Sequence, residues 1–432
     1  MKSEPTNLPL QNQLLQNFPH NQYLRPGKHS ETLLINQLSQ LRADNNQPVF
    51  KFGFGQSPFP VPKEITQILS DSAHRKEYMS VQGHLPLRQA IVNFHNQFER
   101  KNWTSDQVII GAGSKILIYC IMAAFQEAEI LLPAPSWVSY EPQGKLAGHQ
   151  VNWLTTSFDE QWLLTPEKLD LHCQSRKNPN VPLILVFNYP SNPSGQTYSK
   201  QQLKSLATVM RKHKIIVIAD EIYSLLTYDS NYSTLEEFYP EGCIASSGLS
   251  KWCGAGGWRL GFHHIPKQLG QAFFQAVIGI ASETYSCAPS PIQVAATGAY
   301  ENQSLASDFL QKQINLLKDV SIYCSNNLNK AGVKVHDAQG GFYLFPDFSI
   351  FKEKLAARKI ESSEQLTAAI MDETGVALLP GTAFGMSSSS LTVRLAFVDF
   401  DGDQIWSDQN QEYQFDQVKQ GIKLICQWLD KL

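Results

Sequence analysis

The stretch SGLSKWCGAGGWRLG, residues 247–261, says more about the fold than any other part of the chain. It joins two short apolar runs and contains one lysine, Lys251, among several glycines. Glycines let a ligand approach the backbone closely, and a lysine desolvated in such a loop becomes a nucleophile that can form a Schiff base. Arg259, eight positions after the lysine, could bind a phosphate through two parallel hydrogen bonds. The stretch therefore predicts a ligand-binding loop between two strands of a sheet.

Short apolar runs alternate with longer amphipathic stretches through the middle of the chain. Several of the runs are almost wholly apolar, which is typical of strands buried on both faces of a sheet. The runs are residues 108–110, 129–132, 150–154, 183–187, 215–219, 243–246 and 259–262. Helical periodicity lies between some of them, at 85–100 and at 201–213. The alternation predicts an α/β fold with a mostly parallel sheet, in which ligands bind beyond the carboxyl ends of the strands.

The pattern changes near residue 304, where a long helical stretch begins and runs to residue 331. Short strands are expected after it, at 341–345 and 391–397, and a last helix from residue 415. This sequence of elements is typical of a second, smaller α+β domain. The predicted organisation is an N-terminal segment that packs on the small domain (1–75), a large domain (76–303) and the small domain (304–432).

The composition argues against several classes of protein. The formal net charge is only −3, so we expect no binding to nucleic acid or to a membrane surface. No apolar run reaches the roughly 18 residues that a membrane helix needs, and the start of the chain lacks the pattern of a signal peptide. We therefore expect a cytoplasmic protein. The seven cysteines form no Cys-x-x-Cys pair, so we expect neither a metal site nor a disulfide framework.

Polar residues follow the apolar run 215–219, at the point where the strand should end. Asp220 comes first, and a carboxylate there is costly unless it meets a cation such as a protonated pyridine nitrogen. Tyr223, three residues on, could donate a hydrogen bond to a phenolic oxygen on the same ring. Taken alone, the two residues are interpreted more simply as a capping aspartate and a core tyrosine.

Two further loops follow predicted strands. The segment NYPSNPSG, residues 188–195, must turn sharply, and the amide of Asn192 within it could face a ligand oxygen. Taken alone, the segment is interpreted more simply as a turn made of turn-forming residues. The small-residue loop at 111–115 begins a helical pattern, which suits an anion at a helix N-terminus. Neither this loop nor residues 254–261 have the spacing of a Walker A or dinucleotide-binding loop.

In combination, these segments resemble the class I and II aminotransferases, which are fold-type I enzymes that use pyridoxal phosphate (PLP). The lysine stretch is similar to the family's PLP-lysine signature, residues 192–195 to its Asn-Pro-Thr-Gly turn, and 220–223 to its Asp-Glu-x-Tyr. Other similar segments occur in the family's order, at 53–59, 78–88, 133–140, 380–385 and 391–394. The resemblance implies a PLP-transferase-like large domain with a seven-stranded, mostly parallel sheet.

The resemblance also implies roles around the cofactor ring. Lys251 would hold PLP covalently and then move a proton between the substrate Cα and the cofactor. Asp220 would pair with the pyridine nitrogen. Tyr223 and Asn192 would bind the phenolic oxygen, and Trp137 would stack on the ring face.

Further residues would bind the cofactor phosphate and the substrate. The implied phosphate ligands are the backbone at Ser114 and Lys115, the Ser250 hydroxyl, Arg259, and Tyr78 of a neighbouring subunit. The last of these implies a homodimer. Arg394 would bind the substrate α-carboxylate, with help from Gly55 and Asn192.

The reaction implied is ping-pong transfer of an amino group from an amino acid to a 2-oxo acid. Alternatives on the same fold are a carbon–sulfur β-lyase, a cyclopropane-forming synthase or another related PLP enzyme. A remote alternative is a non-catalytic PLP-binding regulator, which the short and non-basic stretch before the first motif disfavours.

The chain departs from the family's pattern at a few positions. Gly248 stands where the family often has a phosphate-binding serine, Gln56 replaces a common glutamate, and Ser136 replaces a common aromatic residue. No arginine occurs between 259 and 358. The chain therefore lacks, in that stretch, the arginine that binds the side-chain carboxylate of the substrate in aspartate-specific members of the family. We therefore expect a neutral or aromatic monocarboxylic substrate, with Lys115 as the alternative partner for a second carboxylate.

Overall fold

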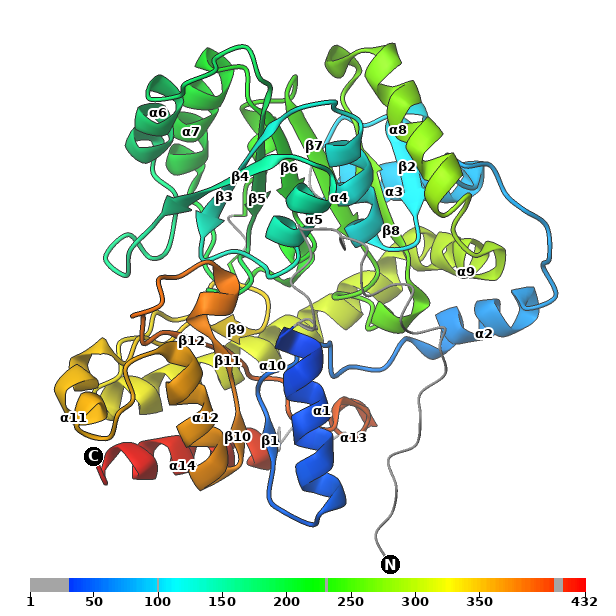
Figure 1. Ribbon diagram of the computed structural model, residues 1–432. Helices are drawn as coiled ribbons and strands as arrows, with labels where there is room; N and C mark the ends of the chain where they lie inside the picture. The colour runs from blue at the N-terminus through cyan, green and yellow to red at the C-terminus, as the bar shows by residue number, and fades with distance from the viewer. Residues whose placement is uncertain (1–30, 99–100, 230–231, 408–414) are drawn as a thin grey trace, which may run out of the picture.

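The computed structural model describes residues 31–98, 101–229, 232–407 and 415–432 (Figure 1). Its centre is a seven-stranded sheet in the order β2-β8-β7-β6-β5-β3-β4. The strands are β2 (Val108–Gly111), β3 (Glu129–Ala134), β4 (Gln150–Thr155), β5 (Leu183–Asn188), β6 (Ile216–Asp220), β7 (Cys243–Gly248) and β8 (Gly261–His264). Strand β8 is antiparallel to both of its neighbours, and the other pairs are parallel. The predicted α/β fold with a mostly parallel sheet is confirmed.

Both faces of this sheet are covered, because its strands are apolar on both sides. In β5, Leu185 and Phe187 belong to the hydrophobic core on the side of α6 and α7, whereas Ile184 and Val186 belong to the core on the side of α4 and α8. The same alternation continues in β6, where Ile218 faces α4 and α8. The covering helices are α4 (Ser114–Ala123), α5 (Tyr140–Leu146), α6 (Pro166–Gln174), α7 (Lys200–Lys212) and α8 (Gln271–Thr284).

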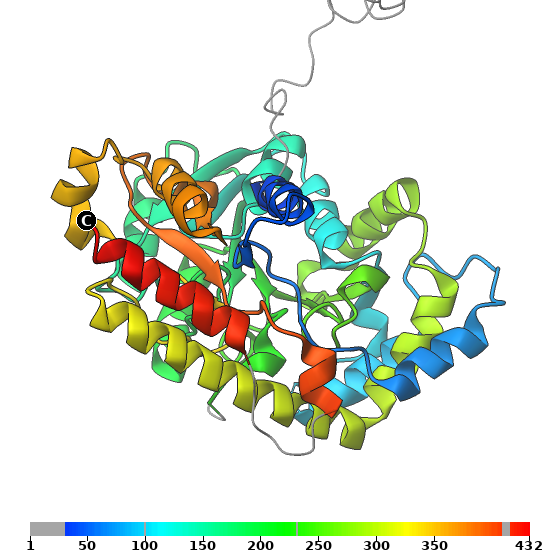
Figure 2. The ribbon, with the colours of Figure 1, turned by 90° about the horizontal axis from the view of Figure 1, so that it is seen from below.

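The C-terminal part of the chain forms a smaller α+β unit, below the large sheet in Figure 1. Its strands make one antiparallel three-stranded sheet, ordered β11 (Leu379–Pro380), β12 (Val393–Ala396) and β9 (Tyr343–Leu344). Its helices are α10 (Gln303–Lys330), α11 (Lys352–Ala357), α12 (Ser363–Thr374), α13 (Gly402–Ser407) and α14 (Asp416–Leu429). Figure 2 shows α10 and α14 lying side by side.

The N-terminal segment contacts both parts of the molecule. Strand β1 (Phe50–Lys51) pairs in parallel with β10 (Val376–Ala377) of the C-terminal unit. Helix α2 (Lys63–Ser72) instead packs along α9 (Ser290–Glu301), which belongs to the central part of the chain. The remaining helices are α1 (Glu31–Asp44) and α3 (Leu85–Phe98). The domain boundaries at 75 and 303 stay predictions, and residues 1–30 lie outside the described residues.

Several predicted boundaries differ from those observed. The strand predicted from residue 259 begins at Gly261, because Arg259 has a φ of 55° and cannot continue an extended strand. The strands predicted at 341–345 and 391–397 are shorter, at Tyr343–Leu344 and Val393–Ala396. Within the described residues, no helix is long and apolar enough to cross a membrane.

Candidate active site

Lys251 lies just beyond the end of β7, in the glycine-rich loop that leads to β8. Its Nζ donates a hydrogen bond to the carbonyl oxygen of Gly55, at 2.9 Å, and lies 5.6 Å from the centre of the Tyr223 ring. Burial, with help from the positive charge of Arg394, lowers the pKa of Lys251 to about 8. About a tenth of this amine is therefore uncharged at about pH 7, and the uncharged form is the one that acts as a nucleophile or base.

Asp220 ends β6 and is 3% exposed. The hydroxyl of Tyr140 donates to its Oδ2 at 2.6 Å, and the Ile222 amide donates to Oδ1 at 3.3 Å. Burial raises the pKa of Asp220 to about 6, although both hydrogen bonds and the charge of Lys251 favour the carboxylate. The group is thus an acceptor that a nearby cation would stabilise further.

Two tyrosines, Tyr223 and Tyr343, lie beside Lys251 and contact each other through their hydroxyl groups. The two hydroxyls lie 2.9 Å apart, and the Tyr343 hydroxyl is 3.4 Å from the carbonyl oxygen of Gly55. A Cβ on Gly55 would fall 1.9 Å from the Tyr343 hydroxyl, so only glycine leaves this approach open. Tyr343 was not among the predicted site residues.

Arg394, on β12, brings a cation into the same region although it is only 1% exposed. Its Nη1 donates to Oδ1 of Asn192 at 3.1 Å, and its Nη2 donates to the carbonyl oxygen of Gly53 at 2.6 Å. Its Nε has no hydrogen-bond partner among the described residues. Burial lowers the pKa of this guanidinium. A buried guanidinium with donor capacity to spare fits a carboxylate ligand.

A cradle for an anion lies at the start of α4. Its N-cap residue, Gly113, has a φ of 91° and supplies no capping side chain, so the first amides of the helix stay free for a ligand. A Cβ on Gly113 would fall 2.2 Å from an Nη atom of Arg259, and a Cβ on Gly261 would fall 2.3 Å from the Ser114 amide nitrogen. The glycines therefore allow the guanidinium and the helix N-terminus to meet.

The structure gives a physical reason for two departures from the family's pattern. At Gly248 a Cβ would fall 2.6 Å from the carbonyl oxygen of Leu260, so a serine there would require β7 and β8 to separate. Ser136 is buried, and its hydroxyl donates to the carbonyl oxygen of Pro133 at 2.6 Å, which satisfies it locally.

Trp137 and Lys115 lie beside each other at the edge of the site. The Lys115 ammonium is 4.8 Å from the centre of the Trp137 ring, and that ring meets the Tyr140 ring edge-on at 5.3 Å. Burial and the charge of Arg259 lower the pKa of Lys115. The side chain thus leans over the predicted stacking residue.

Two predicted residues, Tyr78 and Ser250, have no side-chain contact with this group within the part of the chain that the structure describes. Tyr78 is 90% exposed in the single chain, as a residue that serves a neighbouring subunit would be. Ser250 is placed only by its position next to Lys251. Tyr140 was missed as a functional residue, although its sequence segment was recognised, because nothing in that segment shows which side chain it will meet.

The group as a whole fits PLP. Asp220 offers a buried carboxylate to the pyridine nitrogen, Lys251 offers an amine, and the cradle around Ser114 and Arg259 offers donors to a phosphate. Arg394 stays available for a substrate carboxylate. An acid, an amine and an anion cradle are the groups that a ring with a basic nitrogen, an aldehyde and a phosphate arm would bind.

Comparison with known proteins agrees with this fit. A family model described as "Aminotransferase class I and II" matches residues 47–401. The aspartate/prephenate aminotransferase of Cereibacter sphaeroides is 30% identical over 375 residues, covering 83% of this chain and 90% of the relative. The asparagine–oxo-acid transaminase of Streptococcus mutans is 27% identical, covering 86% and 92%. The crystal structure of the Rhizobium meliloti aspartate aminotransferase shares the fold, with a TM-score of 0.81, 23% identity, and coverage of 96% and 100%.

Proposed function

The chain belongs to the class I and II aminotransferases and is a PLP-dependent transaminase, and from this premise we propose how its own residues carry out amino transfer. When bound, PLP supplies an electron sink that makes the substrate Cα–H acidic. The protein supplies the base, the substrate clamp and the fixed charges around the ring. The observation that carries the proposal is the position of Lys251 beside Gly55 and Tyr223, where the charges of both Arg394 and Asp220 act on its amine.

Lys251 is the proposed proton carrier. Its pKa of about 8 leaves enough neutral amine to accept the proton from the substrate Cα, and the protonated amine can return that proton on the other side of the reaction. Asp220 is proposed to hold a proton on the pyridine nitrogen, while Tyr223 and Asn192 hold the phenolic oxygen. Trp137 covers the ring face and keeps water from it.

Arg394 is proposed to bind the substrate α-carboxylate. Its guanidinium is held by Asn192 and Gly53, which fix its plane before the substrate arrives. The unpartnered Nε and the remaining protons of the two Nη atoms can then form parallel hydrogen bonds with the carboxylate. Such a clamp orients the Cα–H bond toward Lys251.

The phosphate is proposed to bind in the cradle at the start of α4. The ligands would be the backbone of Ser114 and Lys115, the Ser250 hydroxyl and Arg259. Tyr78 of a second subunit would complete the set, so the proposed working unit is a homodimer. A cytoplasmic location stays a prediction of the sequence.

Two substrate classes remain, and each has its own support. The absence of an arginine between 259 and 358 favours a neutral or aromatic monocarboxylic amino acid, and one relative is named for asparagine. The position of the Lys115 ammonium over Trp137 favours an acidic amino acid, and another relative is named for aspartate and prephenate. Substituting Lys115 by glutamine separates the two, because it should lower kcat/KM for aspartate and glutamate only if Lys115 binds a second carboxylate.

The experiment that tests the reaction itself is incubation of the PLP-loaded protein with pools of amino acids and 2-oxo acids. Amino transfer predicts new amino acids that match the added oxo acids. Release of pyruvate and ammonia, without new amino acids, would instead identify a β-lyase. No reaction of either kind would favour the non-catalytic alternative.

A further inference from the structure

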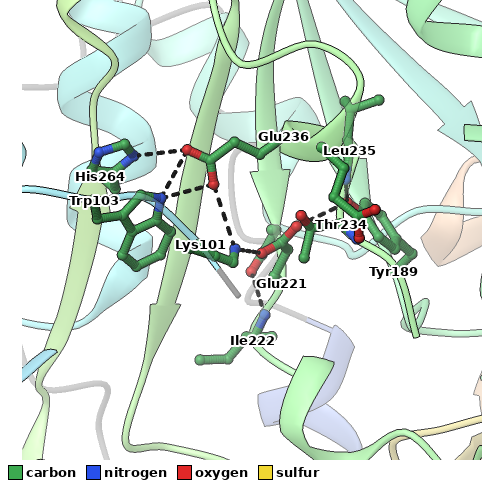
Figure 3. Close-up of polar contacts among 11 residues, drawn as sticks. Lys101, Trp103, Tyr189, Glu221, Ile222, Thr234, Leu235, Glu236 and His264 are labelled. Carbon is green, nitrogen blue, oxygen red and sulfur yellow. Dashed lines mark hydrogen bonds and ion pairs between the residues drawn. The ribbon is translucent and has the colours of Figure 1, made fainter. Parts of the chain in front are cut away.

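A second cluster of charged groups lies on the opposite side of β6 from the cofactor site. Six side chains take part, and we call them the Lys101 network (Figure 3). The members are Lys101, Trp103, Tyr189, Glu221, Glu236 and His264. No role has been given to any of them so far. Their ionisable groups are far too buried for a solvated surface cluster.

The core of the network is an ion pair between Lys101 and Glu221. The Lys101 Nζ lies 2.5 Å from Glu221 Oε2, and each side chain is only 2% exposed. Tyr189 donates its hydroxyl proton to Glu221 Oε1 at 2.8 Å. Breaking a buried pair by removing one partner is strongly unfavourable, because the other charge is left uncompensated. The position of the Glu221 side chain is therefore tightly fixed.

A second carboxylate extends the network toward β8. Glu236 Oε2 lies 3.8 Å from Lys101 Nζ, and both Glu236 oxygens accept from Trp103 Nε1, at 2.8 and 2.7 Å. His264 Nδ1 lies 3.3 Å from Glu236 Oε1, and its ring stacks on that of Trp103 at 4.5 Å. Burial lowers the pKa of His264, which makes the imidazole neutral at physiological pH. One lysine is thus shared by two glutamates.

Glu221 follows Asp220 directly, and the two side chains leave the backbone on opposite sides. Asp220 meets Tyr140 on the α4 side of the sheet, while Glu221 meets Tyr189 on the α7 side. The Glu221 amide donates to the carbonyl oxygen of Ser246 in β7, at 2.9 Å. The two residues share the peptide unit that makes this bond, so a displacement of that unit also moves the Asp220 carboxylate.

The network also reaches the other cofactor-binding segments. Lys101 and Trp103 precede β2, which leads to the anion cradle, and His264 ends β8, which begins two residues after Arg259. Residues in or next to β2, β6 and β8 are thus joined by one set of buried charges, and each of these strands has proposed cofactor ligands at or near one of its ends.

We propose that Lys101 is a positioning residue for Asp220, and that it acts by clamping Glu221 so that the Asp220 carboxylate is aimed at the pyridine nitrogen of PLP. The proposal rests on the role of Asp220 given under the proposed function. The Lys101–Glu221 ion pair would explain how the orientation of the Asp220 carboxylate is maintained. Lys101 is not among the proposed substrate or cofactor ligands, and its partners include Glu221, Glu236 and the Trp103 ring.

Two substitutions break the clamp and leave opposite charges behind. Lys101→Met leaves the Glu221 carboxylate, which keeps its Tyr189 donor, and Glu221→Gln leaves the Lys101 ammonium, which keeps Glu236 at 3.8 Å. A positioning role predicts that both variants lower the pKa of the ring nitrogen, because Asp220 loses its aim in both. A purely electrostatic role predicts opposite shifts, since a residual negative charge favours a protonated ring and a residual positive charge disfavours it.

The readout is the ¹⁵N chemical shift of PLP labelled at the pyridine nitrogen, followed against pH in the loaded protein. We expect both variants to move the ring toward its unprotonated form, with kcat about 10- to 100-fold lower and KM little changed, because Arg394 is untouched. Lys101→Arg keeps a cation and should restore much of the native titration. Lys168→Met is the matched control, since it removes a partly exposed ion pair of the same 2.5 Å length to Glu160, away from the Lys101 network, and should leave the ring titration unchanged.

Further variants keep the outcomes distinct. Asp220→Asn should itself shift the ring titration, and if it does not, the proposed role of Asp220 fails rather than the clamp. If Lys101→Met does not fold, Tyr189→Phe replaces it in the comparison with Glu221→Gln. Tyr189→Phe removes a hydrogen bond to Glu221 without changing any charge, so it should lower the pKa of the ring nitrogen in the same direction. Shifts of opposite sign in the charge-changing variants, or an unchanged titration in variants of the network when Asp220→Asn shifts it, would overturn the proposal.

Discussion

Replacing Asp220 by asparagine should make the cofactor-free protein more stable and the PLP-loaded enzyme much less active. The carboxylate is 3% exposed and, without the cofactor, has no cation in hydrogen-bond contact among the described residues. An asparagine of the same shape can still accept from the Ile222 amide and can donate to the Tyr140 hydroxyl. The substitution therefore removes the cost of a buried charge without emptying space or losing hydrogen bonds.

The magnitude follows from the pKa of Asp220, which burial raises from 3.8 to about 6. The folded protein then binds this proton more tightly than the unfolded chain, so stability is lost as pH rises from about 4 through about 6. The buried carboxylate therefore lowers the free energy of unfolding by about 3 kcal/mol at about pH 7, because its pKa rises by about 2 and each tenfold change in an equilibrium is worth about 1.4 kcal/mol. Near pH 4 this destabilisation falls below about 1 kcal/mol, because the folded protein then holds Asp220 in its protonated form.

Urea unfolding of the cofactor-free native protein and the Asp220→Asn variant, at about pH 7 and about pH 4, measures this difference. We expect the variant to be more stable at the higher pH by up to about 3 kcal/mol, and the two proteins to converge at the lower pH. Saturating PLP should reverse the order, because the variant leaves a ring cation without its carboxylate. A variant that is less stable than the native protein at about pH 7, or a difference independent of pH, would refute the reasoning.

Three other predictions follow from the site. Capture of PLP by the cofactor-free protein should accelerate with a midpoint near pH 8, where Lys251 loses its proton, and a midpoint near 10.5 would show that the amine is not perturbed. Arg394→Lys should lower kcat/KM for every amino acid tested, by a factor that corresponds to about 2–5 kcal/mol of lost transition-state binding, because a single ammonium cannot replace the parallel hydrogen bonds. An unchanged kcat/KM would show that the substrate carboxylate binds elsewhere. Mixed dimers of Lys251→Ala and Tyr78→Phe chains should regain part of the activity that each parent lacks. A protein that is monomeric by light scattering and fully active at the same concentration would contradict the shared site.

Much of the site was accessible to sequence reasoning because the fold places it at strand ends. Each parallel strand finishes at the same edge of the sheet, so the residues directly after the apolar runs, such as Asp220 and Lys251, must gather there. The runs themselves were recognised because burial on both faces makes them almost wholly apolar. The predicted fold and family are confirmed, and the residue roles stay predictions.

The rest depends on contacts between positions far apart in the chain. Tyr140 meets Asp220 across 80 residues, and Tyr343 meets Tyr223 across 120, which no local pattern encodes. The Lys101–Glu221 pair also spans 120 residues. The left-handed conformation of Arg259 was missed because arginine rarely adopts it, and the apolar residues around it suggested an earlier strand.

Lys251 is proposed to carry the cofactor and to pass the proton, and chemical labelling can identify the lysine that does so. Borohydride reduction of the PLP-loaded protein should fix the cofactor irreversibly to one lysine, which peptide mapping can identify. We expect the label to lie on the peptide containing Lys251, and we expect Lys251→Ala to take up no label and to catalyse no amino transfer. A label on any other lysine of the native protein, or amino transfer by the alanine variant at the native rate, would contradict it.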